Sequence, residues 1–72
     1  MSTVAIVTHV YEDAQSVAAL CQALKQVEPE TGARLYVIAV DDGSLRAPPQ
    51  LAALREAGLN GEILRLARNV GH

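Results

Sequence analysis

The stretch LYVIAVDDGS, residues 35–44, decides which fold we expect for this chain. Its first six residues are apolar and rich in β-branched side chains, a pattern typical of a parallel strand buried on both faces. The run stops at two adjacent carboxylates, Asp41 and Asp42, followed by a glycine and a hydroxyl. We therefore expect a strand from Arg34 to Val40 with its acidic end at the carboxyl edge of a sheet, where open α/β sheets bind ligands.

Apolar patterns on either side of this strand predict the order β-α-β-α-β. A first strand is expected at residues 3–8 and a third at residues 62–67, after a turn at residues 59–61. The first helix is expected from Asp13 to about Val27, ended by the Pro and Gly of residues 28–32. A second helix is expected to begin at residues 48–50, after a proline pair, and to end at Gly58. The apolar face of the first helix comprises Val17, Leu20, Cys21, Leu24 and Val27.

This order predicts an α/β fold, a parallel Rossmann-like half-domain that spans residues 1–72 as one unit. Right-handed crossovers favour the strand order 3-2-1. The first strand would then have one unpaired flank, which predicts a homo-oligomer through that exposed edge. A 72-residue chain buries little surface and stops directly after a predicted strand, so we expect a fragment of a longer protein.

Composition limits the classes of function. The net charge is -2, and the six Lys and Arg residues are scattered among eight acids, so we expect no nucleic-acid partner. No stretch approaches the roughly 18 consecutive apolar residues of a membrane span, and no N-terminal targeting pattern is evident, so we expect a cytoplasmic chain. The single cysteine, Cys21, excludes an intrachain disulfide and a clustered zinc site, and its place on the apolar face favours packing.

Polar residues follow all three predicted strands. They are THVYED at residues 8–13, DDGS at residues 41–44 and RNVGH at residues 68–72. The carboxyl ends of parallel strands meet at one edge of a sheet, so these three loops are expected to form one site.

The residues VDDGS, 40–44, together with a Tyr-acid segment after the first strand and an Asn-x-Gly after the third, resemble the start of a family-two, GT-A type inverting glycosyltransferase. The tail at residues 66–72 resembles the polyprenyl-phosphate sugar transferases, the group that includes dolichyl-phosphate mannose synthase. The resemblance covers the whole chain. It implies the N-terminal part of an enzyme that binds a nucleoside-diphosphate sugar and transfers the sugar with inversion.

The resemblance also implies roles for individual residues. Asp42 would accept the imino hydrogen bond of the base, with Asp41 beside it, since a carboxylate is an acceptor-only group. His9 would line the base or ribose, Tyr11 would flank the base, and Arg68 would reach the diphosphate. The candidate nucleotide-binding residues are Asp42, Asp41, His9, Tyr11, Gly43, Ser44, Arg68 and Asn69. The chain offers no candidate catalytic residue and no candidate metal ligand.

The chain departs from the family at several points. It has Glu12-Asp13 where the family usually has Asn-Glu, and Leu45-Arg46 where Thr-Asp often follows the serine. It also lacks the later Asp-x-Asp metal site, the catalytic base and the acceptor-binding region. We therefore expect the 72-residue chain alone to be inactive. Mg²⁺ or Mn²⁺ is expected only in a full-length enzyme. Membrane attachment at the cytoplasmic face and a lipid acceptor would likewise involve only regions outside the chain.

Other interpretations remain open. Asp41 and Asp42 could simply form a turn, Tyr11 could pack, and Glu12 and Asp13 could serve the start of the first helix. The chain as a whole could be a non-enzymatic α/β module that binds a nucleotide or self-associates. A phosphoacceptor receiver domain is a third possibility, but such domains need paired acids after the first strand, where this chain has Thr8-His9.

Overall fold

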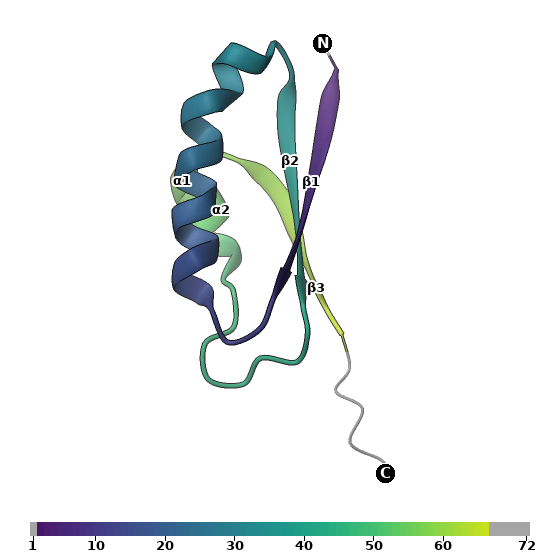
Figure 1. Ribbon diagram of the computed structural model, residues 1–72, viewed down its shortest axis with the longest axis vertical. Coiled ribbons are helices and arrows are strands. Elements are labelled where there is room, and N and C mark those ends of the chain that lie inside the picture. Colours follow the sequence, from purple (N-terminus) through teal and green to yellow (C-terminus); the bar gives the residue numbers. More distant parts are fainter. Residues whose placement is uncertain (1, 67–72) are drawn as a thin grey trace.

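The computed structural model describes residues 2–66, which form a three-stranded parallel sheet and two helices. The elements are β1 (Thr3–Val10), α1 (Ala14–Thr31), β2 (Arg34–Asp41), α2 (Leu51–Ala57) and β3 (Asn60–Arg65). Both helices lie on the same side of the sheet (Figure 1). The predicted α/β class and the β-α-β-α-β order are confirmed, and the architecture is compatible with a small Rossmann-like half-fold.

Strand β2 lies between the other two strands. The order, read from the N-terminal strand, is β1-β2-β3, and both this order and the expected 3-2-1 have β2 in the centre. The register pairs Val10 with Asp41 and Asp41 with Arg65, so the three strands end side by side at one edge. Side chains alternate between the two faces of a strand, and the buried positions of β2 are 35, 37, 39 and 41. The predicted edge for a binding site is therefore present, but Asp41 points toward the helix layer.

Helix α1 begins as expected and ends later than expected. The carboxylate of Asp13 caps it by accepting a hydrogen bond from the backbone N–H of Ser16 at 3.1 Å. The prediction that it ends before Pro29 is wrong, because the helix continues through this proline to Thr31 and ends at Gly32. Pro29 has no N–H and so removes one backbone hydrogen bond, but the helix continues for two more residues before it ends. Gly32 has φ +69°, the left-handed conformation common at helix ends.

The apolar stripe of α1 also differs from the expected one. Val17 and Cys21 are buried, and Leu24 packs against the core, but Val27 is 44% exposed. At about 100° per residue, positions 17, 21, 24 and 28 fall within about 60° of one another, and position 27 falls about 90° from their centre. The inward position in the last turns is thus taken by Glu28, which lies over the start of β2.

Helix α2 and strand β3 are joined by a tight C-terminal cap. The N–H of Leu59 donates to the carbonyl of Leu54 at 2.9 Å, and the N–H of Gly58 donates to the carbonyl of Arg55 at 3.0 Å. This pair of bonds is a Schellman motif, and Leu54 and Leu59 both lie in the core. The expected end at Gly58 is confirmed. The expected turn at 59–61 is wrong, because β3 already begins at Asn60.

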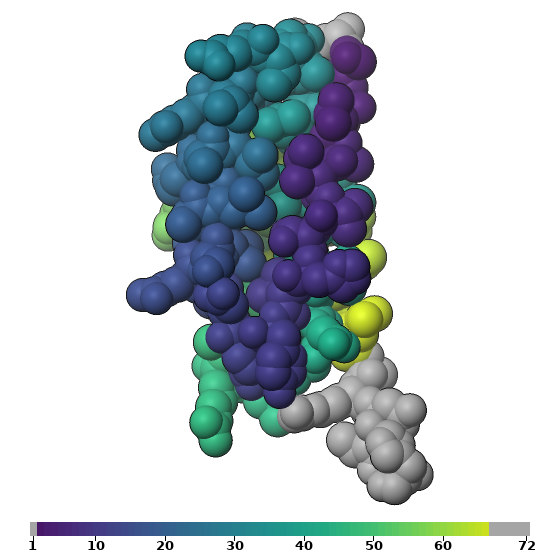
Figure 2. Space-filling view, viewed as in Figure 1, coloured from purple at the N-terminus to yellow at the C-terminus, as the bar shows by residue number. Residues whose placement is uncertain are grey.

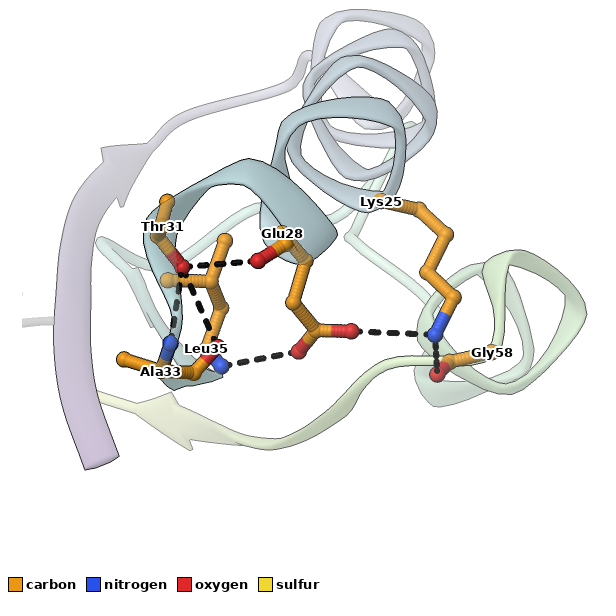
Figure 3. Close-up of polar contacts among 6 residues, drawn as sticks. All are labelled: Lys25, Glu28, Thr31, Ala33, Leu35 and Gly58. Carbon is orange, nitrogen blue, oxygen red and sulfur yellow. Dashed lines mark hydrogen bonds and ion pairs between the residues drawn. The ribbon is translucent and has the colours of Figure 1, made fainter. Parts of the chain in front are cut away.

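A polar cluster fastens the opposite end of the sheet from the candidate site (Figure 3). Glu28 accepts hydrogen bonds from the backbone N–H of Leu35 at 2.8 Å and from the Lys25 ammonium at 3.0 Å. Lys25 also donates to the carbonyl of Gly58 at 3.2 Å. The two bonds that Glu28 accepts lower its pKa, the bond from Leu35 more than the bond from Lys25. The cluster ties α1 to both β2 and the end of α2.

Candidate functional site at the carboxyl edge

The side chain of Asp41 stabilises the loop that follows β2. Its side chain is only 1% exposed, and its Oδ1 accepts the backbone N–H of Ser44 at 3.0 Å. The hydroxyl of Ser44 also bonds to this carboxylate, and these contacts, opposed by burial and assisted by Arg65, lower the pKa of Asp41. Asp41 was expected to lie beside Asp42 in a binding site. In this structure its carboxylate is instead used to shape the turn.

The loop after β2 is tied directly to the loop after β1. The N–H of Glu12 donates to the Ser44 hydroxyl oxygen at 2.7 Å, and Ser44 is itself 93% buried, with 7% of its surface exposed. The N–H of Asp42 donates to the carbonyl of Val10 at 2.9 Å. The Ser44 side chain thus bridges the β1–α1 and β2–α2 loops. Its role is structural on both sides, since it donates to Asp41 and accepts from Glu12.

Glu12 makes the most extensive contacts at this edge. Its Oε1 accepts from the backbone N–H groups of Leu45, Arg46 and Ala47 at 3.1, 2.8 and 2.8 Å, and Oε2 also accepts from Leu45 at 3.1 Å. These backbone bonds, that from Ala47 first, lower the pKa of Glu12. Glu12 also has φ +51°, and it is the one residue other than glycine with positive φ in the described part of the chain.

The expectation that Glu12 serves the start of α1 is wrong. Its carboxylate caps a loop that lies more than 30 residues away in the sequence. The acid-rich segment Glu12-Asp13 gave a signal for a helix start, and Asp13 alone fills that role. Nothing in the local sequence indicates the partners of Glu12, because the three amides belong to the other loop.

Asp42 has the opposite environment from its neighbour. It is exposed, because alternation along β2 turns it away from the helix layer. Gly43 follows it with φ +83°, a conformation that glycine adopts at no steric cost. The carboxylate of Asp42 is therefore presented to solvent on a loop whose backbone is fixed at Val10, Ser44 and Glu12.

The other candidates from the first loop are neighbours in sequence of the residue that holds the Asp42 backbone. His9 and Tyr11 flank Val10, whose carbonyl holds Asp42, and both are exposed. Tyr11 lines two depressions in the surface. One, of about 290 Å³, also includes His9 and the start of α1, and the other, of about 420 Å³, is formed by Tyr11, Glu12, Leu45 and Arg46. The structure thus ties the first two loops together through Val10, Glu12 and Ser44, but neither depression includes Asp41, Asp42, Gly43 or Ser44.

Two predicted site residues, Arg68 and Asn69, lie outside the described residues. Within residues 2–66, no group of three or more His, Cys, Asp or Glu side chains is placed to hold a metal ion. Over the same range, no helix is long and apolar enough to cross a membrane.

Comparison with protein-family models, with curated proteins and with solved structures finds no match to this chain.

Proposed function

We propose that this chain binds the nucleoside of a nucleoside-diphosphate sugar, as the N-terminal segment of a family-two-like inverting glycosyltransferase. The observation that carries the proposal is the contrast between Asp41 and Asp42. One carboxylate is buried and holds the loop, and the other is exposed at the strand tip, on backbone that bonds to Val10 between His9 and Tyr11. An exposed carboxylate on a fixed backbone is suited to accept hydrogen bonds from a ligand.

The chemistry of a carboxylate favours particular bases. Uracil and guanine carry a proton on the ring nitrogen of their pairing edge, whereas cytosine and adenine have an unprotonated acceptor nitrogen there. An acceptor-only group such as Asp42 therefore pairs with the first two bases and repels the acceptor nitrogen of the others. Tyr11 and Arg46 line a depression at the same edge of the sheet, where a flat base and a phosphate would find an aromatic ring and a cation.

Glycosyl transfer itself needs further groups, which we propose lie elsewhere in a longer protein. A sheet of order 3-2-1 in a doubly wound domain would continue past β1 with further strands. The base for the acceptor, the acceptor site, the metal site and any membrane contact would belong to that remainder. The chain alone is proposed to bind nucleotide without turning it over.

The test is a calorimetric or NMR titration of the chain with UDP, GDP, CDP and ADP. We expect UDP or GDP to bind at least tenfold tighter than CDP and ADP. The substitution Asp42→Ala should weaken binding by about tenfold to a hundredfold, because a hydrogen bond to a charged group contributes about 1.5–3 kcal/mol. Asp42→Asn, which keeps one acceptor oxygen, should lose less.

Glu30→Ala provides the control for this experiment, because it removes the same charge from an exposed position in the last turn of α1. Its affinity should equal that of the wild-type chain. Equal binding of all four nucleotides, or unchanged affinity in Asp42→Ala, would contradict the assignment of Asp42 to the base.

A second candidate function is a self-associating module, and the exposed first strand favours it. Within the described residues β1 pairs only with β2, so its other edge offers unpaired backbone groups to a second chain. Strand β1 forms a continuous strip at the surface (Figure 2). Val7 is 59% exposed and Val4 is 45% exposed. Apolar side chains on an open edge strand promote association of one copy with another.

Light scattering after size-exclusion chromatography tests this candidate. The wild-type chain should shift from monomer to dimer as its concentration rises, and Val7→Lys should remain monomeric, since lysine on an edge strand opposes pairing. Gln26→Lys adds the same charge at an exposed position of α1 and should behave like the wild type. A wild-type chain that stays monomeric at millimolar concentration would rule the module out.

A further inference from the structure

The Glu12 carboxylate links the two loops that carry the exposed site residues. Tyr11 precedes it in the β1–α1 loop, and its three amide partners follow Ser44 in the β2–α2 loop. A second bond runs the other way, from the N–H of Glu12 to the Ser44 hydroxyl. Glu12 thus donates a hydrogen bond to the β2–α2 loop and accepts hydrogen bonds from it. Together these contacts fix the position and the orientation of that loop relative to Glu12.

The backbone conformation of Glu12 supports a specific function for these contacts. Its φ of +51° is uncommon for a residue with a long side chain and costs free energy unless surrounding contacts compensate. Here Glu12 has five hydrogen bonds to the β2–α2 loop that supply such compensation. That loop has few contacts of its own near its tip, since Leu45 is 75% exposed and Arg46 is exposed as well.

We propose that Glu12 is a positioning residue that holds the β2–α2 loop in the conformation that binds the nucleoside. The inference rests on the proposed function and deepens it. With the carboxylate in place, the loop is ordered before the ligand arrives, and Asp42 is held at the end of β1. Without it, the three amides bond to water and the loop populates other conformations. The apparent Kd then rises by the inverse of the fraction of time that the loop is in the binding conformation.

The test compares Glu12→Ala and Glu12→Gln with the wild type, at a temperature where circular dichroism shows each chain folded. Glu12→Ala should weaken binding of UDP or GDP about tenfold, as expected if the loop is competent about one tenth of the time. Glu12→Gln keeps the acceptor oxygen that all three amides share and should restore affinity to within about threefold. Glu30→Ala, again the charge-matched control, should bind like the wild type.

Amide hydrogen exchange, measured by NMR, gives a readout that does not depend on nucleotide. In the wild-type chain the amides of Leu45, Arg46 and Ala47 should exchange more slowly than that of Gly43, and Glu12→Ala should remove this protection. The amide of Val37 in central β2 should stay protected in both. This contrast separates loss of the loop contact from loss of the fold.

The outcomes distinguish this inference from the proposed function. If the wild type binds nucleotide and Glu12→Ala binds it equally well, Glu12 has no positioning role and the proposed function stands. If the wild type binds none of the four nucleotides, both fall, whatever the exchange rates show. Unprotected amides at residues 45–47 in the wild-type chain would overturn the positioning role even if Glu12→Ala fails to fold.

Discussion

Gly61 shows how one residue can set the spacing of two strands. It pairs with Val37 of β2, and a Cβ at this position would collide with the Val37 backbone carbonyl. The neighbour is main chain in the centre of the sheet, so it cannot rotate away. We expect Gly61→Ala to lower the free energy of unfolding by about 1–3 kcal/mol, the usual cost of overpacking, measured by urea denaturation. The melting temperature should fall by about 4–8 °C for each kcal/mol lost.

Gly32 is the matched control for this prediction, because its requirement for glycine has the opposite cause. It has a positive φ, and nothing lies within 4 Å of a Cβ built there. Asparagine tolerates the left-handed conformation, so Gly32→Asn should retain most of the stability. If Gly61→Ala and Gly32→Asn cost the same, the contact with Val37 is not what requires glycine in β3.

At the scale of the elements, sequence patterns identified every helix and strand and misplaced several ends. Pro29 and Gly61 are expected to interrupt an element. In the structure Pro29 lies inside α1, two residues before its end, and Gly61 lies inside β3 against the Val37 backbone. The ends of these elements depend on contacts with neighbouring elements, and the spacing of residues along the chain carries no information about such contacts. Val27 was misplaced for a different reason, because spacings of three and four include residues at the flank of a helical stripe.

The candidate site divides in the same way. The period of two along β2 puts Asp41 in phase with buried Leu35, Val37 and Ala39. The apolar run predicts a strand buried on both faces, however, and both carboxylates are expected in the site, so their different roles emerge only from the structure. The grouping of loops at one edge followed from parallel topology. The bonds from residues 45–47 to Glu12 could not be predicted, because they require a positive φ and the meeting of two loops in space.

At the scale of the whole molecule, three carboxylates should make stability depend on acid. Hydrogen bonds are the main cause of the lowered pKa values of Glu12, Glu28 and Asp41. In the folded chain these bonds come from groups in a neighbouring loop or strand, or in the same turn. In the unfolded chain these groups have their ordinary pKa values, 4.5 for Glu and 3.8 for Asp. As the pH falls, the unfolded chain therefore binds protons before the folded chain does. A lowered pKa contributes stability that is fully present above the unfolded value and disappears as the pH falls through the folded one.

Urea denaturation followed by circular dichroism should therefore give the same unfolding free energy at pH 7 and pH 6, and a progressively smaller one below about pH 4.5, the ordinary Glu value. The double variant Glu12→Gln, Glu28→Gln should be less stable at pH 7 and should lose less between pH 6 and pH 3, since it retains only the Asp41 contribution. The two carboxylates fasten opposite ends of the sheet, Glu12 at the carboxyl edge and Glu28 at the start of β2. Equal acid sensitivity of the wild type and the double variant would mean that these two ends do not control the stability of the fold.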